Sequence, residues 1–354
     1  MAHTIRPEDL IIHFLNVGFG DTILIEFPQD KDGKRSYGLV DCYNAKKTKK
    51  YLKELQKTRP GITQFKFICA THPHWDHIAG IDSLLNDKKY RPEEFWDSGF
   101  RHESKTYVKI LNSLLLQNIK TRRISSGWEW YSGNVSITAL APSIRLRNRY
   151  ATYGVDMNNA SIVLRIEHHK ENILTIKSLE YKGTSSVEAK REAGQSVIIL
   201  AGDAEYDSWA HITDEYPKLE RTPENKPLVK KMINYLSCSV LKISHHGSMH
   251  STPLDVYEKM VPGTAIISTK QETDSKTTNV QTLTRELFPH QLTITALEEI
   301  GAQIHTTDGS YETKNTSTSQ PPGSILVVLP PGGKPIVKKL IDTTKQIPKV
   351  LNQI

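Results

Sequence analysis

The feature that most constrains the fold of this chain is a group of metal-ligand side chains placed directly after a short apolar run. Phe65–Ala70 has the length and composition of a buried strand. The next seven residues read THPHWDH, so three imidazoles and one carboxylate fall within six residues. His72 and His74 can share one metal ion, and Asp76 and His77 can face a second. A solvent-exposed histidine-rich loop is the alternative, and it leaves this spacing unexplained.

Two later strand-like runs also end in metal-ligand side chains. Val197–Leu200 leads into Ala-Gly-Asp, which ends at Asp203, and a carboxylate at a strand end can bridge two cations. Val240–Ile243 leads into the adjacent histidines His245 and His246. Each signal alone has an ordinary explanation, a turn or a solvated histidine pair. Three ligand clusters at three strand ends make chance a poor explanation, and they predict one shared metal centre.

The order of apolar runs predicts an α/β (α+β) chain with two β-rich halves, each accompanied by helices. This arrangement favours an αββα sandwich over a doubly wound sheet. The expected strands are Ile11–Val17, Thr22–Phe27, Tyr37–Val40, Phe65–Ala70, Val135–Leu140, Ser161–Ile166, Ile173–Ile176, Val197–Leu200, Val240–Ile243, Ala265–Ser268 and Ser324–Leu329. The expected helices are Thr48–Lys57, Ile81–Leu85, Thr106–Gln117, Asp207–Lys218, Pro227–Leu236 and Pro253–Met260.

Composition limits the setting in which such a centre would work. The 354 residues contain no apolar run of membrane-helix length, so we expect no membrane partner. The chain has three widely spaced cysteines, and Met1–Leu10 lacks the apolar core of a signal peptide. Both observations predict a cytoplasmic protein. The net charge of +7 permits an anionic partner without demonstrating one, and the oligomeric state stays open.

Together these motifs resemble the metallo-β-lactamase superfamily, whose signature is HxHxDH. The similarity is narrower still to the hydrolase domain of ComEC-like competence (DNA-uptake) proteins and their stand-alone relatives. The phosphorylcholine esterase of choline-binding surface proteins resembles the same branch. We call Thr71–His77 the histidine loop. The other segments that carry the resemblance are Phe14–Asp21 (FLNVGFGD), Asn159–Leu164, Ala201–Asp203, His245–Ser248, and Gly301–Ile304 with Thr306.

The resemblance covers residues 11–330 and implies an αββα sandwich of two mixed sheets flanked by helices. We therefore expect one hydrolase domain over residues 1–330, with insertions near 101–132 and 179–195. A basic C-terminal tail is expected over residues 331–354.

Roles for single residues follow from matching them to the superfamily motifs. The implied cofactor is a pair of divalent ions, Zn²⁺ or Mn²⁺, and the implied metal ligands are His72, His74, Asp76, His77, Asp203 and His246. Asp76 would also orient the attacking water. The histidine before glycine is the superfamily ligand, so His246 is favoured as ligand and His245 as a catalytic donor to the substrate. Asp41, Asn158 and Ser248 are expected to lie next to the metal ligands and to orient them without binding the metal.

The sequence departs from the superfamily pattern at one ligand. Many members carry another histidine before the strand at Ser161, whereas this chain and the competence branch have asparagine there, and Asn158 is a possible substitute. The metal at His72 and His74 therefore has fewer protein ligands and is expected to bind more weakly. His168 and His169 lie beyond the strand and are expected to be solvated.

The resemblance to the competence proteins and the excess of basic over acidic residues favour a phosphodiester substrate, most simply DNA or RNA. Basic residues that can neutralise phosphates are Lys46, Lys47, Lys49, Lys50, Lys53, Arg122, Arg123, Arg145, Arg147 and Arg149. Aromatic residues that can stack on bases or simply pack are Trp75, Trp128, Trp130 and Tyr131. Two alternatives stay open: hydrolysis of a small non-nucleotide ester (phosphorylcholine-esterase-like, thioester or lactam), and a binding module with a weakened metal site.

Overall fold

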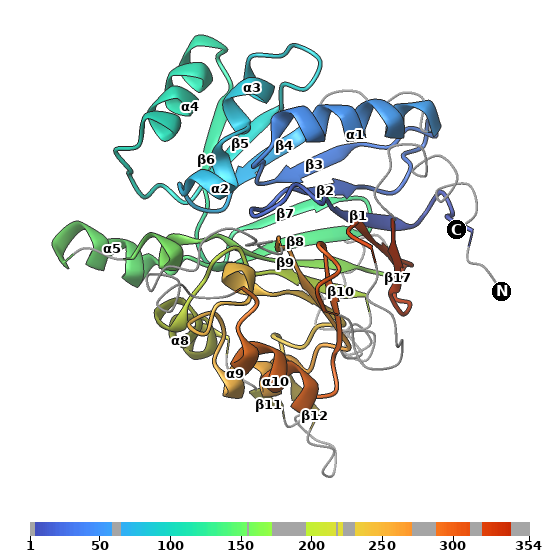
Figure 1. Cartoon of the computed structure of the whole chain (residues 1–354), viewed down its shortest axis with the longest axis vertical. Helices are drawn as coiled ribbons and strands as arrows, with labels where there is room; N and C mark the ends of the chain where they lie inside the picture. The colour runs from blue at the N-terminus through green and yellow to red at the C-terminus, as the bar shows by residue number, and fades with distance from the viewer. Residues whose placement is uncertain are drawn as a thin grey trace, which may run out of the picture.

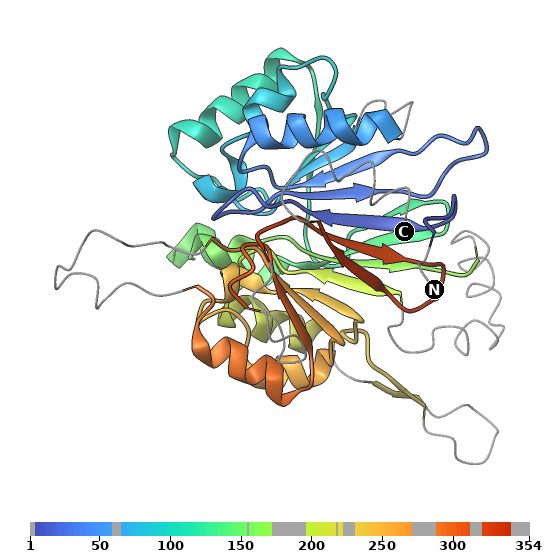
Figure 2. The same cartoon turned by 45° about the vertical axis from the view of Figure 1, so that its right-hand side comes forward.

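Two mixed β-sheets stacked face to face form the centre of the computed structural model (Figure 1). The structure describes residues 4–58, 65–153, 156–171, 196–216, 219–221, 231–270, 288–311 and 321–340. Helices cover the outer face of each sheet, which gives four layers in the order helix, sheet, sheet, helix (Figure 2). The predicted αββα architecture is therefore confirmed.

The first sheet has eight strands in the order β17-β16-β1-β2-β3-β4-β5-β6. Neighbours from β17 to β3 are antiparallel, and those from β3 to β6 are parallel. The strands are β1 (Leu10–Phe14), β2 (Ile23–Glu26), β3 (Tyr37–Val40), β4 (Phe65–Ala70), β5 (Glu94–Asp97), β6 (Lys120–Arg123), β16 (Ile325–Leu329) and β17 (Ile336–Lys339).

The second sheet has seven strands in the order β15-β14-β13-β10-β9-β8-β7. Neighbours from β7 to β10 are antiparallel, and those from β10 to β15 are parallel. Its strands are β7 (Glu129–Ser132), β8 (Val135–Ala141), β9 (Val163–His168), β10 (Val197–Leu200), β13 (Val240–Lys242), β14 (Thr264–Ile267) and β15 (Gln303–Thr306). A separate hairpin pairs β11 (Leu219–Arg221) with β12 (Lys231–Ile233).

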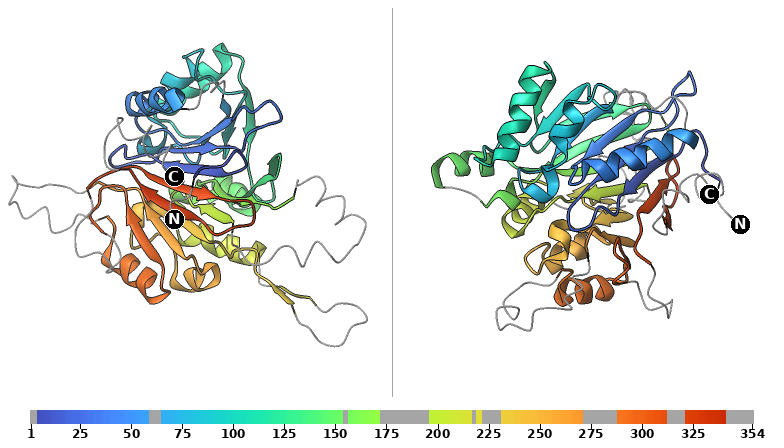
Figure 3. Two further views of the ribbon diagram at one scale, coloured as in Figure 1. Left: turned by 90° about the vertical axis from the view of Figure 1, so that its right-hand side faces the viewer. Right: turned by 45° about the horizontal axis from the view of Figure 1, so that its top comes forward.

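Helices lie outside both sheets (Figure 3). Those of the first half are α1 (Ala45–Thr58), α2 (Trp75–Ile78), α3 (Ile81–Leu85), α4 (Lys105–Leu116) and α5 (Ile144–Tyr153). Those of the second half are α8 (Tyr206–Glu215), α9 (Leu254–Met260) and α10 (Gln291–Glu299), with single 3₁₀ turns η1 (Met157–Ala160) and η2 (Ser244–Gly247). Within the described residues, no helix is both long and apolar enough to cross a bilayer.

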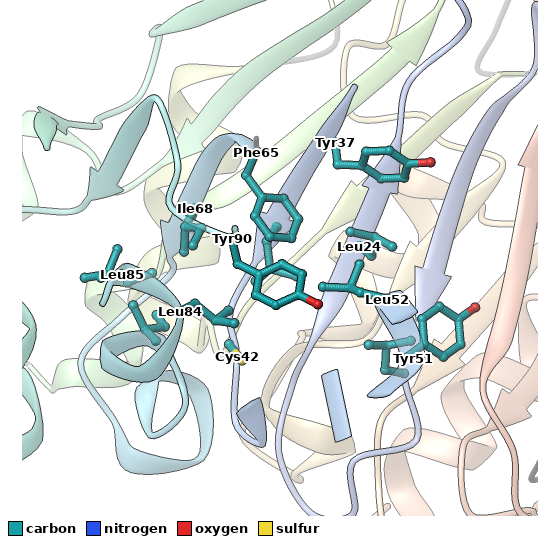
Figure 4. Packing of buried hydrophobic residues seen from close by; sticks show 14 of the residues in the cluster. Leu24, Tyr37, Cys42, Tyr51, Leu52, Phe65, Ile68, Leu84, Leu85 and Tyr90 are labelled. Carbon is teal, nitrogen blue, oxygen red and sulfur yellow. The ribbon is translucent and has the colours of Figure 1, made fainter. Parts of the chain in front are cut away.

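In the central strands β1, β8, β10 and β16, side chains on both faces are buried, which explains why these strands are largely apolar. In β1, Ile12 points into the core between the sheets, whereas Ile11 points into a core under the helices of the first half. Figure 4 shows part of that outer core, where Leu52 of α1 and Leu84 of α3 pack with Leu24 of β2. A third core joins α8, α9 and α10 to the outer face of the second sheet.

Most of the strands and helices expected from the sequence are present, but two expectations are wrong. Pro227–Leu236 was expected to be helical, yet residues 231–233 form the strand β12. The basic tail expected from residue 331 instead begins with β17, which pairs with β16 at the edge of the first sheet. Residues 101–132 contain α4, β6 and β7, so this expected insertion extends both sheets. The expected strand Ile173–Ile176 and the insertion at 179–195 lie outside the described residues.

The expectation that His168 and His169 are solvated is also wrong, because both side chains are buried. His168 Nδ1 donates to the Leu329 carbonyl oxygen at 2.6 Å, and its Nε2 is buried without a hydrogen-bond partner. His169 Nε2 lies 2.8 Å from Ser136 Oγ. The two histidines therefore connect the end of β9 to β16 and β8. The contact with β16, near the C-terminus, holds His168 in its buried position.

This burial predicts a pH dependence of stability. Burial lowers the pKa of His168 to about 4, against a hydrogen bond to Leu329 that acts the other way. The unfolded chain therefore binds a proton that the folded chain excludes between pH 6.5 and pH 4. The corresponding stability is present above pH 6.5 and is lost as the pH falls towards 4, by on the order of 3 kcal/mol.

We expect His168→Asn to flatten this part of the profile, because asparagine keeps the donor to Leu329 and does not titrate. Urea unfolding at several pH values measures the free energy of unfolding directly. If the free energy of unfolding changes with pH in the same way in the variant and the wild type, His168 is ruled out as the source of the pH dependence.

Candidate metal centre

The metal-ligand side chains expected from three separate motifs meet at one end of the two sheets. Ligand atoms of Asp76, His77, Asp203 and His246 all lie within 4.8 Å of one another. Asp76 and His77 lie in the one-turn helix α2 that follows β4, Asp203 follows β10, and His246 follows β13. The cluster therefore joins the first sheet to the second, and three of its four members are buried.

Asp203 lies close to His77 and to His72. Its Oδ2 is 3.0 Å from His77 Nε2 and 3.7 Å from His72 Nε2. His246 Nε2 lies 3.4 Å from Asp76 Oδ2. The half-buried His74 completes the group, with its ring centroid 4.7 Å from that of His72. The six side chains expected as ligands thus lie in one group, and Asp203 is within 4 Å of two of its histidines.

The hydrogen bonds of the imidazole rings fit metal ligation. His77 Nδ1 donates to Asp41 Oδ2 at 2.7 Å, and His246 Nδ1 donates to the Ser268 carbonyl oxygen at 2.7 Å. His72 Nδ1 lies 3.2 Å from the Thr71 hydroxyl oxygen. In each ring the bonded nitrogen is thus Nδ1, which leaves Nε2 to face the cluster. These three Nε2 atoms and Asp203 Oδ1 are buried without a hydrogen-bond partner. Buried lone pairs without a hydrogen-bond partner, on imidazole nitrogen and carboxylate oxygen, are what a metal ion would satisfy.

A proton can take the place of a metal at His77. Burial lowers the pKa of this imidazole, but the carboxylates of Asp203 and Asp41 outweigh burial and raise it well above its usual value. A metal ion that binds here must displace this proton, so metal affinity falls in acid.

Asp41 contacts the histidine loop through its carboxylate. It lies directly after β3 with a positive φ of 57°, and its side chain is buried. Its carboxylate accepts hydrogen bonds from the Thr71 amide at 2.8 Å, from the Thr71 hydroxyl at 2.7 Å and from His77 Nδ1. One carboxylate thereby fixes both the start and the end of the loop.

The two adjacent histidines point in different directions because of a left-handed turn. His245, His246 and Gly247 all have positive φ, at 43°, 51° and 81°. Such values are uncommon for residues other than glycine and cluster at functional sites. The turn buries His246 against Asp76 and leaves His245 partly exposed. Ser248, directly after the turn, accepts a hydrogen bond from the His250 amide at its hydroxyl.

Glu205 is a functional candidate that sequence reasoning missed. Its Oε1 lies 2.8 Å from His245 Nδ1 and accepts a hydrogen bond from Asn158 Nδ2 at 2.9 Å. The predicted supporting residue Asn158 therefore acts through Glu205 on His245. The sequence feature that could have identified Glu205 is its position two residues after Asp203, in Gly-Asp-Ala-Glu.

A buried ion pair between Asp21 and Lys242 was also missed. Lys242 Nζ donates to Asp21 Oδ2 and lies 3.5 Å from the Gly202 carbonyl oxygen. Both side chains are fully buried, and Asp21 Oδ2 is 3.9 Å from His77 Nδ1. Burial lowers the pKa of Lys242, but Asp21 outweighs it and the net direction is upward. Lys242, although neutralised by Asp21, therefore also interacts electrostatically with Asp203 and Asp41.

The loop that carries Asp21 approaches the histidine loop very closely. The Asp21 amide donates to the Asp76 carbonyl oxygen at 3.1 Å. Gly20 has φ 135°, and a Cβ at this position would lie 2.5 Å from the same oxygen. Only glycine allows this approach.

Several residues of the predicted basic clusters are engaged in ion pairs or backbone hydrogen bonds. Lys49 pairs with Asp87, Arg122 with Glu94, Arg145 with Asp214 and Arg149 with Asp207. Arg147 donates to the carbonyl oxygens of Ser98 and Ile124.

The predicted aromatic residues divide into packed and exposed ones. Trp128 and Trp130 pack against the core between the sheets, so packing is the correct interpretation for them. Trp75 lies within the histidine loop and is exposed.

Three comparisons place this arrangement among known proteins. A family model described as "Metallo-beta-lactamase superfamily" matches residues 15–118. ComE operon protein 3 of Bacillus subtilis is 23% identical over 251 residues, which cover 71% of this chain. The matched part spans about a quarter of that relative, 24% of its length.

Two solved structures are similar over most of the chain. The metallo-beta-lactamase fold protein YhfI of Bacillus subtilis is 13% identical, with 84% of this chain and 96% of that chain covered and a TM-score of 0.43. A diphosphatase of the PhnP family is 12% identical, with 70% of each chain covered and a TM-score of 0.33. The chain has the metallo-β-lactamase fold, and residues 15–118 match the family model of that superfamily.

Proposed function

We propose that this chain is a metal-dependent phosphodiesterase that hydrolyses nucleic acid, DNA or RNA. The observation that carries the proposal is the set of buried, unsatisfied Nε2 atoms and the Asp203 oxygen that converge at the end of both sheets. The chemistry of these donors fits divalent Zn²⁺ or Mn²⁺.

Two ions fit the two groups of ligands. Asp76, His77, Asp203 and His246 would hold one ion, and His72 and His74 would share Asp203 with a second. The second group has fewer protein ligands, so its ion is expected to be held more weakly. When bound, such ions make hydroxide available near neutral pH and hold the oxygens of the substrate.

The protein's own groups would position the reactants. Asp76 is the most exposed carboxylate of the cluster, so it can accept a hydrogen bond from the attacking water. His245 faces outward beside the cluster and is oriented by Glu205. A ring held through Nδ1 in this way presents Nε2 to the substrate, where it can donate a proton to the leaving oxygen.

Two features support a nucleic-acid phosphodiester over other esters. The motifs resemble the competence branch in particular, and the chain carries an excess of positive charge at +7. Backbone phosphates are neutralised by arginine and lysine without a need for sequence-specific contacts.

A substrate panel tests the proposal. The metal-stripped full chain is reloaded with Mn²⁺ or Zn²⁺ and offered labelled single-stranded DNA, duplex DNA and RNA. Bis-p-nitrophenyl phosphate, a thioester, a β-lactam and a phosphorylcholine ester serve as comparison substrates. We expect cleavage of phosphodiesters only in the presence of metal, and kcat/KM to be highest for a nucleic acid. Faster turnover of the thioester, the lactam or the phosphorylcholine ester would reject the proposal in favour of a small-ester hydrolase, and bound metal without any turnover would favour a binding module.

A further inference from the structure

Two phenylalanine rings lie against the two adjacent histidines of the metal centre. The ring centroid of Phe19 is 4.6 Å from that of His246, with the ring planes 39° apart. The ring centroid of Phe288 is 5.6 Å from that of His245, with the planes 43° apart. The two phenylalanine rings also contact each other, with centroids 5.4 Å apart. The four rings therefore form one cluster that contains an expected metal ligand and the expected donor to the substrate.

The loop that carries Phe19 is held at the metal centre by close backbone contacts. Phe19 lies between β1 and β2, and its neighbours Gly18 and Gly20 both have positive φ, at 97° and 135°. The Asp21 amide, two residues after Phe19, donates to the Asp76 carbonyl oxygen at 3.1 Å. This loop from the first sheet therefore fixes one aromatic side chain beside the metal ligands.

Phe288 reaches the same place from the second sheet, after β14 and before α10. Its carbonyl oxygen accepts a hydrogen bond from the Thr269 hydroxyl at 3.1 Å. Two residues later, the His290 amide donates to the Gly247 carbonyl oxygen at 2.8 Å. Gly247 belongs to the left-handed turn that carries the two adjacent histidines. The two phenylalanines are thus positioned independently, by segments that belong to different sheets.

Both phenylalanines are partly exposed, and so are the polar groups beside them. Neither Phe19 nor Phe288 belongs to the three apolar cores, and both have intermediate burial. The side chains of His245 and Asp76 are each 22% exposed. A substrate that contacts these two polar side chains would therefore also meet the phenylalanine rings. Flat aromatic rings are the groups that pack best on such partly exposed ring surfaces.

We propose that Phe19 and Phe288 form a stacking platform for a nucleobase next to the scissile phosphate. The choice of a nucleobase rests on the proposed function, because the nucleobases are the aromatic rings of a nucleic acid. Every base has an aromatic face, so stacking recognises the presence of a base without reading the sequence. The stacking platform therefore favours a strand with bases over a phosphodiester chain that lacks them.

A pair of substrates that differ only in their bases tests this proposal. Labelled oligothymidylate is compared with a strand of the same length built from abasic deoxyribose phosphates, or with the ribose counterparts of both if RNA is the better substrate. The two strands carry the same backbone charge, and the comparison does not depend on which linkage is cleaved. The values of kcat/KM are measured with metal for the wild type, Phe19→Leu, Phe288→Leu and Phe19→Tyr. Circular dichroism first establishes that each variant is folded.

We expect the wild type to prefer oligothymidylate over the abasic strand by at least about five-fold in kcat/KM. Leucine is apolar but has no ring, so the preference is expected to fall below about two-fold in Phe19→Leu and in Phe288→Leu. Tyrosine keeps the ring, so Phe19→Tyr is expected to retain the preference of the wild type. Equal losses on both strands in the folded leucine variants, with an unchanged preference, would overturn the stacking platform, because the rings would then only orient the histidines.

Binding of the same two strands separates the stacking platform from the proposed function. Fluorescence anisotropy in the presence of a chelator measures the Kd of each strand without cleavage. Tighter binding of oligothymidylate that is lost in Phe19→Leu, with no cleavage by the metal-loaded wild type, would reject the proposed function and keep the stacking platform. Cleavage of both strands with equal kcat/KM by the wild type would reject the stacking platform and keep the proposed function. A wild-type chain that neither binds nor cleaves either strand would overturn both.

Discussion

Replacing Asp203 with asparagine is expected to lower metal-dependent hydrolysis by at least about 10³-fold. Asp203 Oδ2 lies within reach of both His72 Nε2 and His77 Nε2, at 3.7 and 3.0 Å. An amide of the same size keeps the shape of the site but removes the negative charge that would bridge two cations. Both ions would then be held poorly, and the water would lose the acidification that bound metal supplies. Initial rates on the best phosphodiester measure the effect.

Asp207→Asn is the matched control for this prediction. Asp207 lies four residues later, at the start of α8, where its carboxylate is exposed and 3.7 Å from Arg149 Nη1. Exposed pairs of this kind contribute little, so we expect activity and stability close to wild type. Activity of Asp203→Asn within ten-fold of the control would show that Asp203 is not part of the catalytic centre.

Lys242→Met is expected to lower the free energy of unfolding by about 3–5 kcal/mol. Methionine fills the volume of the lysine stem, so little packing is lost. The substitution nevertheless leaves Asp21 as a fully buried carboxylate without its cation, close to Asp41 and His77. Urea denaturation of the metal-free chain measures the loss independently of activity.

Two further variants separate the charge effect from packing. Adding Asp21→Asn to Lys242→Met removes the unpaired charge, so we expect it to restore at least half of the lost stability. Lys259→Met breaks the exposed pair between Lys259 and Asp255, 3.1 Å apart, and is expected to cost less than about 1 kcal/mol. A loss in Lys242→Met no larger than in Lys259→Met would contradict the account of the buried pair.

The candidate centre was predictable from the sequence because its chemistry is local. Each ligand set follows a short apolar strand and consists of residue types that bind metal, so each set is visible in its own stretch of sequence. His72, Asp203 and His246 could therefore be assigned to one centre although they are far apart in the chain. The layer architecture was predictable for the same reason, since apolar runs of strand length alternate with amphipathic segments.

The partners that hold the centre in place were not predictable, because they pair residues that are distant in sequence and belong to different sheets. Lys242 lies 221 residues from Asp21, and neither residue has a distinctive local pattern. The burial of His168 depends on Leu329, 161 residues away. The sequence predicts a tail where β17 lies, because nothing in this Lys-rich segment indicates that it pairs with the edge strand β16.

The most direct test of the metal centre is the number of divalent ions bound per chain. The purified full chain and Asp203→Asn are dialysed against micromolar Zn²⁺ or Mn²⁺, and bound metal is measured by elemental analysis. We predict between about one and two ions per wild-type chain, the weaker one at His72 and His74, and a clear loss in the variant. Substantially less than about one ion per wild-type chain, or equal metal in both proteins, would contradict the metal centre described above.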